Sequence, residues 1–288
     1  MINKIDVVMP TYNSERFLKP VLDSVYCEIP VCHLILMDGF STDGTLEIAK
    51  QYPNVKIIQT RQSLGKCREL GIKQVDTEWF AFVDSDIVLE EGWFRQVQRH
   101  IKPDVGAVEG LDLLMDPRRG AFQTGMVKLR ELLRKSYHPK KSKRAFTGDT
   151  FIRTELLSDF KFIHKFRHGK TWGGAFADQL IRQHVEDKGF KWVKTEDYVC
   201  RHYDFKPPIR SLTSGEFLTF IGHSSLRDAF KNMLTIIPKV LYAFYVTKEW
   251  RMVSYQFKWY FYSLKGAIQG TLKRKMVARC GENQYGFE

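Results

Sequence analysis

The stretch Trp79-Phe-Ala-Phe-Val-Asp-Ser-Asp86 runs through five apolar residues and ends in two carboxylates separated by one serine. Such a short run of aromatic and β-branched residues predicts a strand buried on both faces, as in the centre of a parallel sheet. Asp84 and Asp86 then lie at the carboxyl end of that strand, where open α/β sheets bind ligands. There they can hold a divalent cation that neutralises the phosphates of a nucleotide. The alternative is a capped turn, because Asp and Ser also favour turns and helix N-termini.

Length and composition limit the possible classes of protein. The 288 residues, 43% of them hydrophobic, suffice for one large α/β domain with an appendage or for two modest domains. A net charge of +12 indicates anionic partners: nucleotide phosphates, nucleic acid or an acidic membrane surface. The five cysteines show no metal-ligand or disulfide-framework spacing. With no signal peptide and no apolar segment approaching the ~20 residues of a bilayer span, we expect a cytoplasmic location.

Three strand-turn-helix units precede the central strand. Apolar runs over Ile5 to Met9, Leu34 to Met37 and Val55 to Ile58 predict strands, each followed by a polar turn and a helix. The first helix contains Pro20, so we expect it to be kinked or to begin near Lys19. Repeated βα units of this length predict a Rossmann-like nucleotide-binding half. The missing Gly-x-Gly-x-x-Gly and Walker lysine motifs argue against dinucleotide oxidoreductases and P-loop NTPases.

Polar residues follow each of these predicted strands. Asn13 or Ser14 can cap the first helix, and Asp38 can accept a hydrogen bond from a base N–H or a ribose hydroxyl. Lys66 and Arg68 open the third helix and are candidates to meet phosphate or a ribose-side acid, although basic residues on helices are usually solvated. We therefore expect the nucleotide at this edge of the sheet.

The second half of the chain differs in character. It contains a predicted strand at Val105 to Val108, a predicted helix at Thr124 to Leu133 and a cationic stretch from Arg134 to Arg144. A solvated loop is the ordinary interpretation of that stretch. Since the next predicted strand carries Gly148 and Asp149, a lid or acceptor-phosphate loop is the alternative.

Two further residues are candidates for chemistry. Asp178 lies in the first turn of a predicted helix, where an acid complements the helix dipole or, in a water-poor site, serves as a general base. His202 follows a predicted strand over Lys191 to Val199 and offers a metal or pyrophosphate contact, or an ordinary polar contact.

The C-terminal region is helical and rich in aromatic residues. Met233 to Val246 and Trp250 to Leu264 interleave aromatics with Lys and Arg, in runs too short and too charged to span a bilayer. This pattern predicts helices that lie in a membrane interface. The alternative is a helical pair packed against the catalytic domain or against a second subunit in a homodimer.

Taken in order, several motifs resemble the family-two glycosyltransferases of GT-A fold, and the resemblance runs from about Ile5 to His202. These motifs are Val7-Val-Met-Pro-Thr-Tyr-Asn13, Met37-Asp-Gly-Phe-Ser-Thr-Asp-Gly-Thr45, Gly65-Lys-Cys-Arg-Glu-Leu-Gly71, Val83-Asp-Ser-Asp86, Gly148-Asp-Thr-Phe-Ile-Arg153 and Ala177-Asp-Gln179. The resemblance implies an α/β fold, with a Rossmann-like mixed sheet flanked by helices and a C-terminal helical appendage. We expect a catalytic domain over residues 1–205 and a helical region over residues 206–288.

The resemblance also implies inverting transfer of a sugar from a nucleoside diphosphate donor, with Mn²⁺ or Mg²⁺. It implies that the nucleotide is bound by Pro10, Thr11, Tyr12, Asn13, Asp38, Arg68, Asp84 and Ser85. It places the metal on Asp86, with Asp84 and His202 as further ligands, and the catalytic base at Asp178. Gly148 and Asp149 fall in the motif expected near the acceptor.

Three departures from the family pattern limit these expectations. Gly39 follows Asp38 where the family usually has a second acid, which leaves the base open. Ala177 replaces the glutamate that usually precedes the catalytic acid, and Gln256-Phe-Lys-Trp259 does not match the Gln-x-x-Arg-Trp motif of processive synthases. Polymer export is therefore not expected.

The expected function is a membrane-associated, metal-dependent inverting glycosyltransferase that moves a sugar from a UDP- or GDP-sugar to a lipid-linked or cell-surface glycan acceptor. A polyprenyl-phosphate sugar synthase is the alternative within the class, since an ionised phosphate acceptor needs no base. A sugar-phosphate nucleotidyltransferase would normally carry a glycine-rich basic loop after the first strand, and this chain does not. A non-enzymatic basic binding protein is the last alternative. No nucleic-acid-binding motif appears, so we expect no nucleic-acid partner.

Overall fold

The computed structural model describes residues 2, 4–112, 145–162, 177–202, 212, 215, 216, 219 and 224–280. They fall into two compact units, which we call the sheet unit (2–112, 145–162 and 177–202) and the helical unit (212–280). The expected division into a catalytic domain over residues 1–205 and a helical region over residues 206–288 stays a prediction. The helix predicted at 124–133 and the cationic stretch 134–144 lie outside the described residues.

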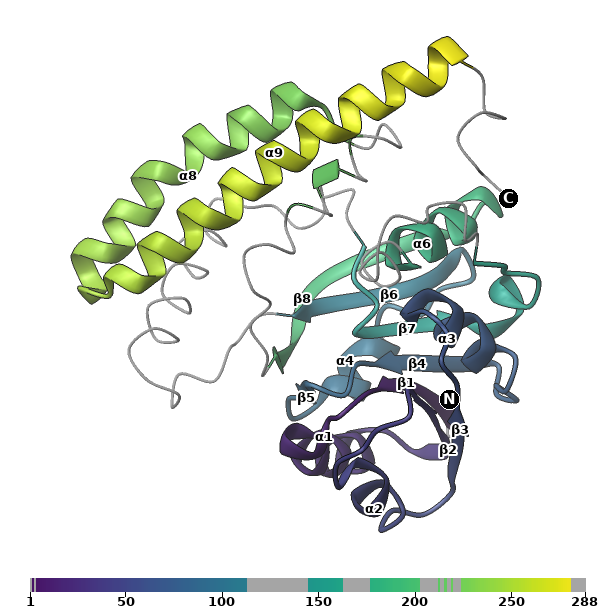
Figure 1. Ribbon diagram of the computed structural model, residues 1–288. Coiled ribbons are helices and arrows are strands. Elements are labelled where there is room, and N and C mark those ends of the chain that lie inside the picture. Colours follow the sequence, from purple (N-terminus) through teal and green to yellow (C-terminus); the bar gives the residue numbers. More distant parts are fainter. Residues whose placement is uncertain are drawn as a thin grey trace. The chain divides into compact units, whose positions relative to one another are not determined.

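One mixed sheet of eight strands forms the sheet unit, in the order β3-β2-β1-β4-β7-β6-β8-β5 (Figure 1). The strands are β1 (Ile5–Thr11), β2 (Val31–Asp38), β3 (Val55–Gln59), β4 (Trp79–Val83), β5 (Ile87–Leu89), β6 (Val105–Asp112), β7 (Asp149–Arg153) and β8 (Lys191–His202). The first four strands in this order are parallel, β7 is antiparallel to both β4 and β6, β6 pairs parallel with β8, and β5 pairs antiparallel with β8. The expected α/β fold with a mixed sheet is confirmed.

Helices cover both faces of this sheet. They are α1 (Glu15–Glu28), α2 (Thr45–Ala49), α3 (Leu64–Ile72), α4 (Trp93–Gln98) and α6 (Ala177–Asp187), with a short 3₁₀ helix at Thr154–Leu157. Apolar residues of α1 and α4 belong to one core cluster, and those of α3 and α6 belong to the other. The sheet therefore separates two hydrophobic cores.

The central strand β4 contributes to both of these cores. Trp79, Ala81 and Val83 pack into the cluster that contains α1, whereas Phe80 and Phe82 pack into the cluster that contains α3. Alternate side chains of a strand point to opposite faces, and all five are buried. The prediction of a strand buried on both faces is confirmed.

The register of the parallel strands aligns their carboxyl ends. Thr11 pairs with Asp38, and Asp38 pairs with Gln59, so β1, β2 and β3 end at one level. Val83, the last residue of β4, pairs with Asp149 of β7. The polar residues after these strands therefore share one edge of the sheet.

Two boundaries differ from the sequence predictions. Helix α1 begins at Glu15 and contains Pro20, so of the two alternatives expected for this helix, a kink or a start near Lys19, the later start was wrong. Proline has no N–H to donate to the carbonyl of Arg16. Because Pro20 is exposed, water can reach that carbonyl instead. His202 is the last residue of β8 rather than a residue after a strand, because pairing with β5 extends the strand that far.

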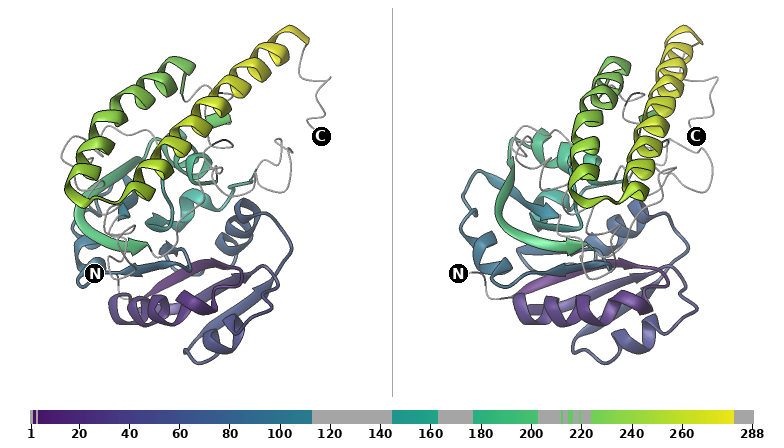
Figure 2. Two further views of the ribbon diagram at one scale, coloured as in Figure 1. Left: turned by 60° about the vertical axis from the view of Figure 1, so that its left-hand side comes forward. Right: turned by 90° about the vertical axis from the view of Figure 1, so that its left-hand side faces the viewer.

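Two long helices, α8 (Leu226–Thr247) and α9 (Trp250–Cys280), run side by side in the helical unit (Figures 1 and 2). A capping box between Ser225 and Asp228 starts α8. A Cβ on Gly266 or Gly270 would overlap backbone atoms of Leu212 or Glu216, so α9 packs closely against these two residues through its small residues. Within the described residues, none of the helices has the length and apolarity needed to cross a membrane.

Candidate functional site

The Asp-Ser-Asp triplet forms a tight turn between β4 and β5. The backbone N–H of Asp84 donates to the carbonyl of Gly148 at 2.9 Å, and the N–H of Ile87 donates to the carbonyl of Asp84 at 3.0 Å. A Cβ on Gly148 would overlap the side chains of Phe146 and Ile87. The absence of a side chain at Gly148 thus lets β7 approach the turn and hold it.

A buried guanidinium joins two of the predicted site acids. Nη2 of Arg68 lies 2.8 Å from Oδ1 of Asp84, and Nη1 lies 2.6 Å from Oδ1 of Asp178. Burial alone would lower the pKa of Arg68, but Asp178 and Asp84 raise it above its ordinary value, so the side chain is charged. Helix α3 places Arg68 over the ring of Phe82, with 5.7 Å between the guanidinium carbon and the ring centre. The predicted catalytic acid, Asp178, and the predicted nucleotide-binding acid, Asp84, are thus parts of one ion-paired cluster.

Thr147 is a second donor to the predicted base. Its hydroxyl donates to Oδ1 of Asp178 at 2.6 Å, the same oxygen that accepts from Arg68. Asp178 lies in the first turn of α6, as the sequence predicts. Donors from α3 and from the segment before β7 therefore fix the orientation of this carboxylate.

Asp86 faces a different partner. Its Oδ2 lies 3.0 Å from Nε2 of His202, because the antiparallel pairing of Ile87 with His202 brings the last residue of β8 beside the turn. A carboxylate oxygen and an imidazole nitrogen at hydrogen-bond distance form a donor set that suits Mn²⁺ and, through the oxygen, Mg²⁺. This pair fits the divalent cation that the resemblance implies.

The structure separates the three predicted metal ligands, since Asp84 is paired with Arg68 while Asp86 is paired with His202. Among the residues that the structure describes, the one set of three metal-capable side chains with ligand atoms within 4.8 Å of one another is Asp6, Cys32 and His33. Its carboxylate, on fully buried Asp6, already accepts hydrogen bonds from the backbone N–H groups of residues 33, 76 and 77. We interpret that set as a structural network of the sheet.

The predicted base-contacting acid is rigidly held. Asp38 is fully buried and accepts from the backbone N–H and hydroxyl of Ser41, at 3.0 and 2.5 Å, and from Nε2 of Gln59 at 3.0 Å. Ser41 also accepts from the backbone N–H of Asn13 at 2.9 Å. Tyr12 beside this network is 64% exposed, so its ring is available to a ligand.

Hydroxyl groups link the first turn to the acidic triplet. The hydroxyl of Thr11 donates to that of Ser14 at 2.8 Å, and the Ser14 hydroxyl lies 2.8 Å from that of Ser85. Ser14 is the N-cap residue of α1 but makes no side-chain capping bond, because its hydroxyl is used in this chain. The turns after β1 and β4 are therefore coupled directly.

Two other predicted residues, Pro10 and Asp149, are part of the sheet itself, and Lys66 lies on α3. Pro10 is buried in β1, and Asp149 is fully buried in β7, where its Oδ2 accepts from the thiol of Cys200 at 3.3 Å. Lys66, a phosphate candidate, pairs instead with Glu69 at 2.6 Å.

Sequence reasoning missed the residues that hold the site acids in place. Ser41 and Gln59 fix Asp38, and Thr147 fixes Asp178. A signal existed for two of them: Ser41 follows Asp38 by three residues, as in an Asx-type turn, and Gln59 is the polar residue that ends the neighbouring strand. Nothing in the sequence marks Thr147 as a partner of Asp178.

Comparison with known proteins shows which family and which fold this chain is similar to. Residues 6–112 match the family model described as Glycosyl transferase family 2. The mannosyltransferase PcManGT from Pyrobaculum calidifontis, in complex with GDP-Man and Mn²⁺, has a similar structure, with a TM-score of 0.59 at 15% identity over 94% of this chain and 87% of that chain. The chain has the fold of the GT-A glycosyltransferases. The match over residues 6–112 confirms, for that part of the chain, the resemblance to glycosyl transferase family 2 noted in the sequence.

Two curated relatives match parts of the chain. Poly(ribitol-phosphate) beta-N-acetylglucosaminyltransferase TarS of Staphylococcus aureus is 36% identical over 92 residues, which are 29% of this chain and 16% of TarS. The cholesterol galactosyltransferase of Borreliella burgdorferi is 28% identical over 188 residues, which are 63% of this chain and 49% of that protein. The chain thus spans half or less of the length of these relatives.

Proposed function

We propose that this protein is an inverting, metal-dependent glycosyltransferase that moves a sugar from a UDP- or GDP-sugar to a lipid-linked or cell-surface glycan acceptor. The observation that carries the proposal is the Arg68 bridge between Asp84 and Asp178, next to the Asp86–His202 pair. This arrangement supports the proposal, because an acid that could serve the acceptor and a pair that could hold the donor's cation lie at the edge where open α/β sheets bind ligands.

Each part of the cluster has a role in this proposal. Asp178 accepts the proton of the acceptor hydroxyl as that oxygen attacks the anomeric carbon from the side opposite the leaving diphosphate. Asp86 and His202 hold the divalent cation, whose chemistry is to take up the negative charge of the leaving group. Asp84 and Ser85 meet the ribose, and Arg68 orients both acids.

The base and ribose lie against the ends of β1 and β2. Asp38, oriented by Ser41 and Gln59, accepts a hydrogen bond from an N–H of the base, and Tyr12 contributes its exposed ring. Both uracil and guanine offer such an N–H, so UDP and GDP are both candidates. Pro10, Thr11 and Asn13 shape the turn.

With a lipid-linked or cell-surface acceptor, the protein would act as a peripheral protein at the cytoplasmic face of a membrane. The charge and aromatic content of the C-terminal region support it, as does the cholesterol galactosyltransferase among the relatives. Gly148 and Asp149 shape the neighbouring part of the site. A homodimer through the helical unit stays a second possibility for that region.

A polyprenyl-phosphate sugar synthase is the second candidate. One observation favours it: Asp178 already pairs with Arg68, and an ionised phosphate acceptor needs no base. In that enzyme Asp178 would orient the acceptor only.

Calorimetric titration of UDP and GDP, each with and without Mn²⁺, tests the proposal. We expect wild type to bind one nucleotide in a metal-dependent manner, and Asp86→Ala and His202→Ala to lose the metal dependence. Asp76→Ala is the matched control, because this exposed carboxylate pairs only with Lys56 among the described residues. Binding of neither nucleotide by a folded protein would reject the transferase.

A further inference from the structure

Helix α9 exposes a continuous apolar stripe. Trp250, Phe257, Phe261, Ile268 and Leu272 follow one another at spacings of seven, four, seven and four residues, which places them on one face of a helix. All five are exposed, Trp250 to 65% and Phe261 to 61%. The opposite face is the packed one, where Met252, Gln256, Gly266, Ala267 and Gly270 are buried. Packing within the helical unit therefore does not explain the stripe.

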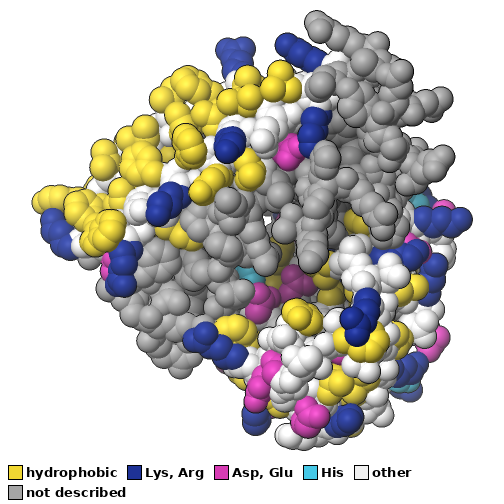
Figure 3. All heavy atoms as spheres, in the orientation of Figure 1, with side chains coloured by type: hydrophobic (Ala, Val, Ile, Leu, Met, Phe, Trp, Pro, Cys, Tyr) yellow, Lys and Arg dark blue, Asp and Glu magenta, His cyan; other side chains and the backbone are white. Residues whose placement is uncertain are grey.

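Helix α8 carries a second stripe of the same kind. Phe230, Leu234, Leu241 and Tyr245 are spaced by four, seven and four residues and are all exposed, Tyr245 to 70%. Ile236 and Val240, on another face, are buried. Figure 3 shows hydrophobic side chains gathered along these two helices, with Lys and Arg side chains among and around them. Exposed apolar area of this extent marks an interaction surface.

The two helices also hold most of the net charge. Residues 224–280 contain eleven Lys and Arg against two Asp and Glu, a net charge of +9 out of the chain's +12. Lys258 and Lys265, both exposed, lie beside the α9 stripe at helical spacing, and the ammonium group of Lys248 lies 4.4 Å from the ring centre of Tyr245. Long cationic side chains beside an apolar face can reach outward while their stems stay on apolar surface.

We propose that the two stripes are a binding surface for an anionic lipid bilayer, with the aromatic and aliphatic side chains in the interface and the Lys and Arg side chains on lipid phosphates. Charge decides between this partner and a second copy of the chain. A spacing of seven and four also suits a helix pair. However, two copies of the hairpin formed by α8 and α9, each with a charge of +9, would repel each other, whereas an anionic surface attracts each of them.

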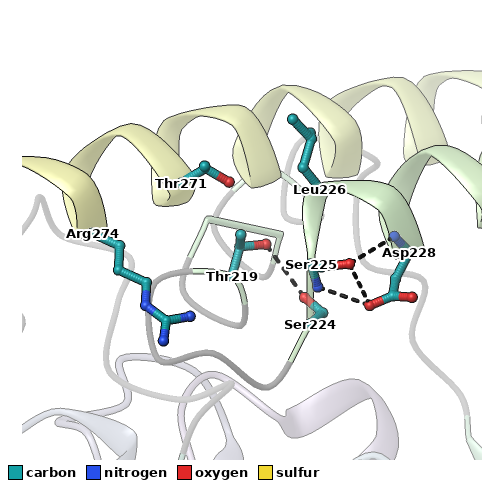
Figure 4. A pocket seen from close by; sticks show the side chains of 7 residues that line it. All are labelled: Thr219, Ser224, Ser225, Leu226, Asp228, Thr271 and Arg274. Atoms are coloured by element: carbon teal, nitrogen blue, oxygen red, sulfur yellow. Dashed lines mark hydrogen bonds between the residues drawn. The ribbon is translucent and has the colours of Figure 1, made fainter.

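The ends of the hairpin differ in a way that orients it. At the α8–α9 connection lie Tyr245, Lys248 and Trp250, whose amphipathic side chains favour the headgroup region. At the opposite end a pocket is lined by polar groups, among them Ser225, Asp228 and Arg274 (Figure 4). The connection therefore enters the interface more deeply, and the polar end stays hydrated.

This inference deepens the proposed function. It rests on that function in one respect only: the enzyme would bind its acceptor at the membrane surface to which the hairpin binds. Flotation of the full chain with vesicles tests it. We expect the protein to float with equal parts of phosphatidylcholine and phosphatidylglycerol, to stay behind with phosphatidylcholine alone, and to bind less at high salt. The triple variant, Trp250→Gln/Phe257→Gln/Phe261→Gln, should partition from water to the anionic vesicles about tenfold less strongly, or more weakly still.

The matched control is Asn232→Gln/Thr235→Gln, which changes exposed polar positions of α8 and should leave flotation unchanged. Wild type that remains unbound with both vesicles, or a triple variant that floats as wild type does, would overturn the inference. A third outcome would also overturn it: wild type is a dimer in sedimentation equilibrium and does not float, and the triple variant is a monomer. Nucleotide titration on the triple variant should be unchanged, which separates a failure here from a failure of the transferase.

Discussion

Arg68 donates a hydrogen bond of 2.6 Å to Asp178, although the two residues are 110 positions apart in the sequence. The same buried guanidinium donates to Asp84 at 2.8 Å. Because guanidinium is planar and rigid, the two carboxylates have a fixed separation and orientation. Donor-side and acceptor-side chemistry in the proposed enzyme thus depend on one side chain.

Replacing Arg68 should therefore affect both stability and nucleotide binding. Arg68→Met leaves two close carboxylates without their cation, and we expect a loss of about 3–5 kcal/mol in the free energy of unfolding. Arg68→Lys keeps the charge but reaches one carboxylate at a time, so it should lose less stability while still weakening nucleotide binding. Urea denaturation and calorimetry measure the two effects. Arg61→Lys, an exposed arginine over the ring of Phe40, is the control, and wild-type stability in Arg68→Met would contradict the proposed bridge.

Asp178→Asn separates the two candidate acceptors. With a hydroxyl acceptor, loss of the base should lower the transfer rate by roughly 10²–10⁴, whereas a phosphate acceptor should keep most of the rate. Single-turnover assays with radiolabelled donor and each acceptor class measure it. Thr147→Val is the matched control, since it removes one donor to Asp178 and leaves the carboxylate. Loss of nucleotide affinity in Asp178→Asn by more than a few fold would instead assign this residue to the donor site.

Much of the sheet unit was predictable because short apolar runs end at turn residues. The run from Trp79 to Val83 defines β4, and the acids beyond it fall at the ligand-binding edge. A strand near Gly148 and Asp149 was predicted too, but the antiparallel position of β7 between β4 and β6 was not, because its pairing depends on contacts between distant segments. Local pattern identifies a strand but not its neighbours.

The candidate site was predictable in its acids but not in their partners. Position alone suggested that Arg68 meets an acid, yet its second partner, Asp178, comes from a helix far along the chain. The resemblance gives Asp84 to the nucleotide and Asp86 to the metal, but it does not predict that Asp84 pairs with Arg68, since turn residues two positions apart can point to different neighbours. Side-chain direction at a turn depends on the tertiary fold, which spacing does not encode.

Gly148→Ala should disturb the acidic turn. The new methyl group would overlap the side chains of Phe146 and Ile87, and the carbonyl of Gly148 holds the N–H of Asp84. We expect a loss of about 1–3 kcal/mol in unfolding free energy and weaker metal-dependent nucleotide binding. Gly189→Ala is the control: its φ of +83° makes alanine costly, but nothing lies within 4 Å of the added Cβ. If both variants reduce nucleotide binding equally, the turn has no special role.

Glu69 should make stability depend on pH in the acid range. Burial would raise its pKa, but hydrogen bonds from Lys66, the N–H of Phe162 and Lys73 lower the pKa of Glu69 to about 2, against an ordinary value of 4.5. The folded state therefore binds this proton less readily, and the stabilisation, on the order of 3 kcal/mol, is present above pH 4.5 and lost as the pH falls toward 2. Glu69→Gln should thus destabilise the protein at pH 7 more than at pH 3, as measured by urea denaturation at both values. Exposed Glu47→Gln should show no such difference, and an equal loss for Glu69→Gln at both pH values would mean that its packing, not its charge, stabilises α3 against residues 161–162.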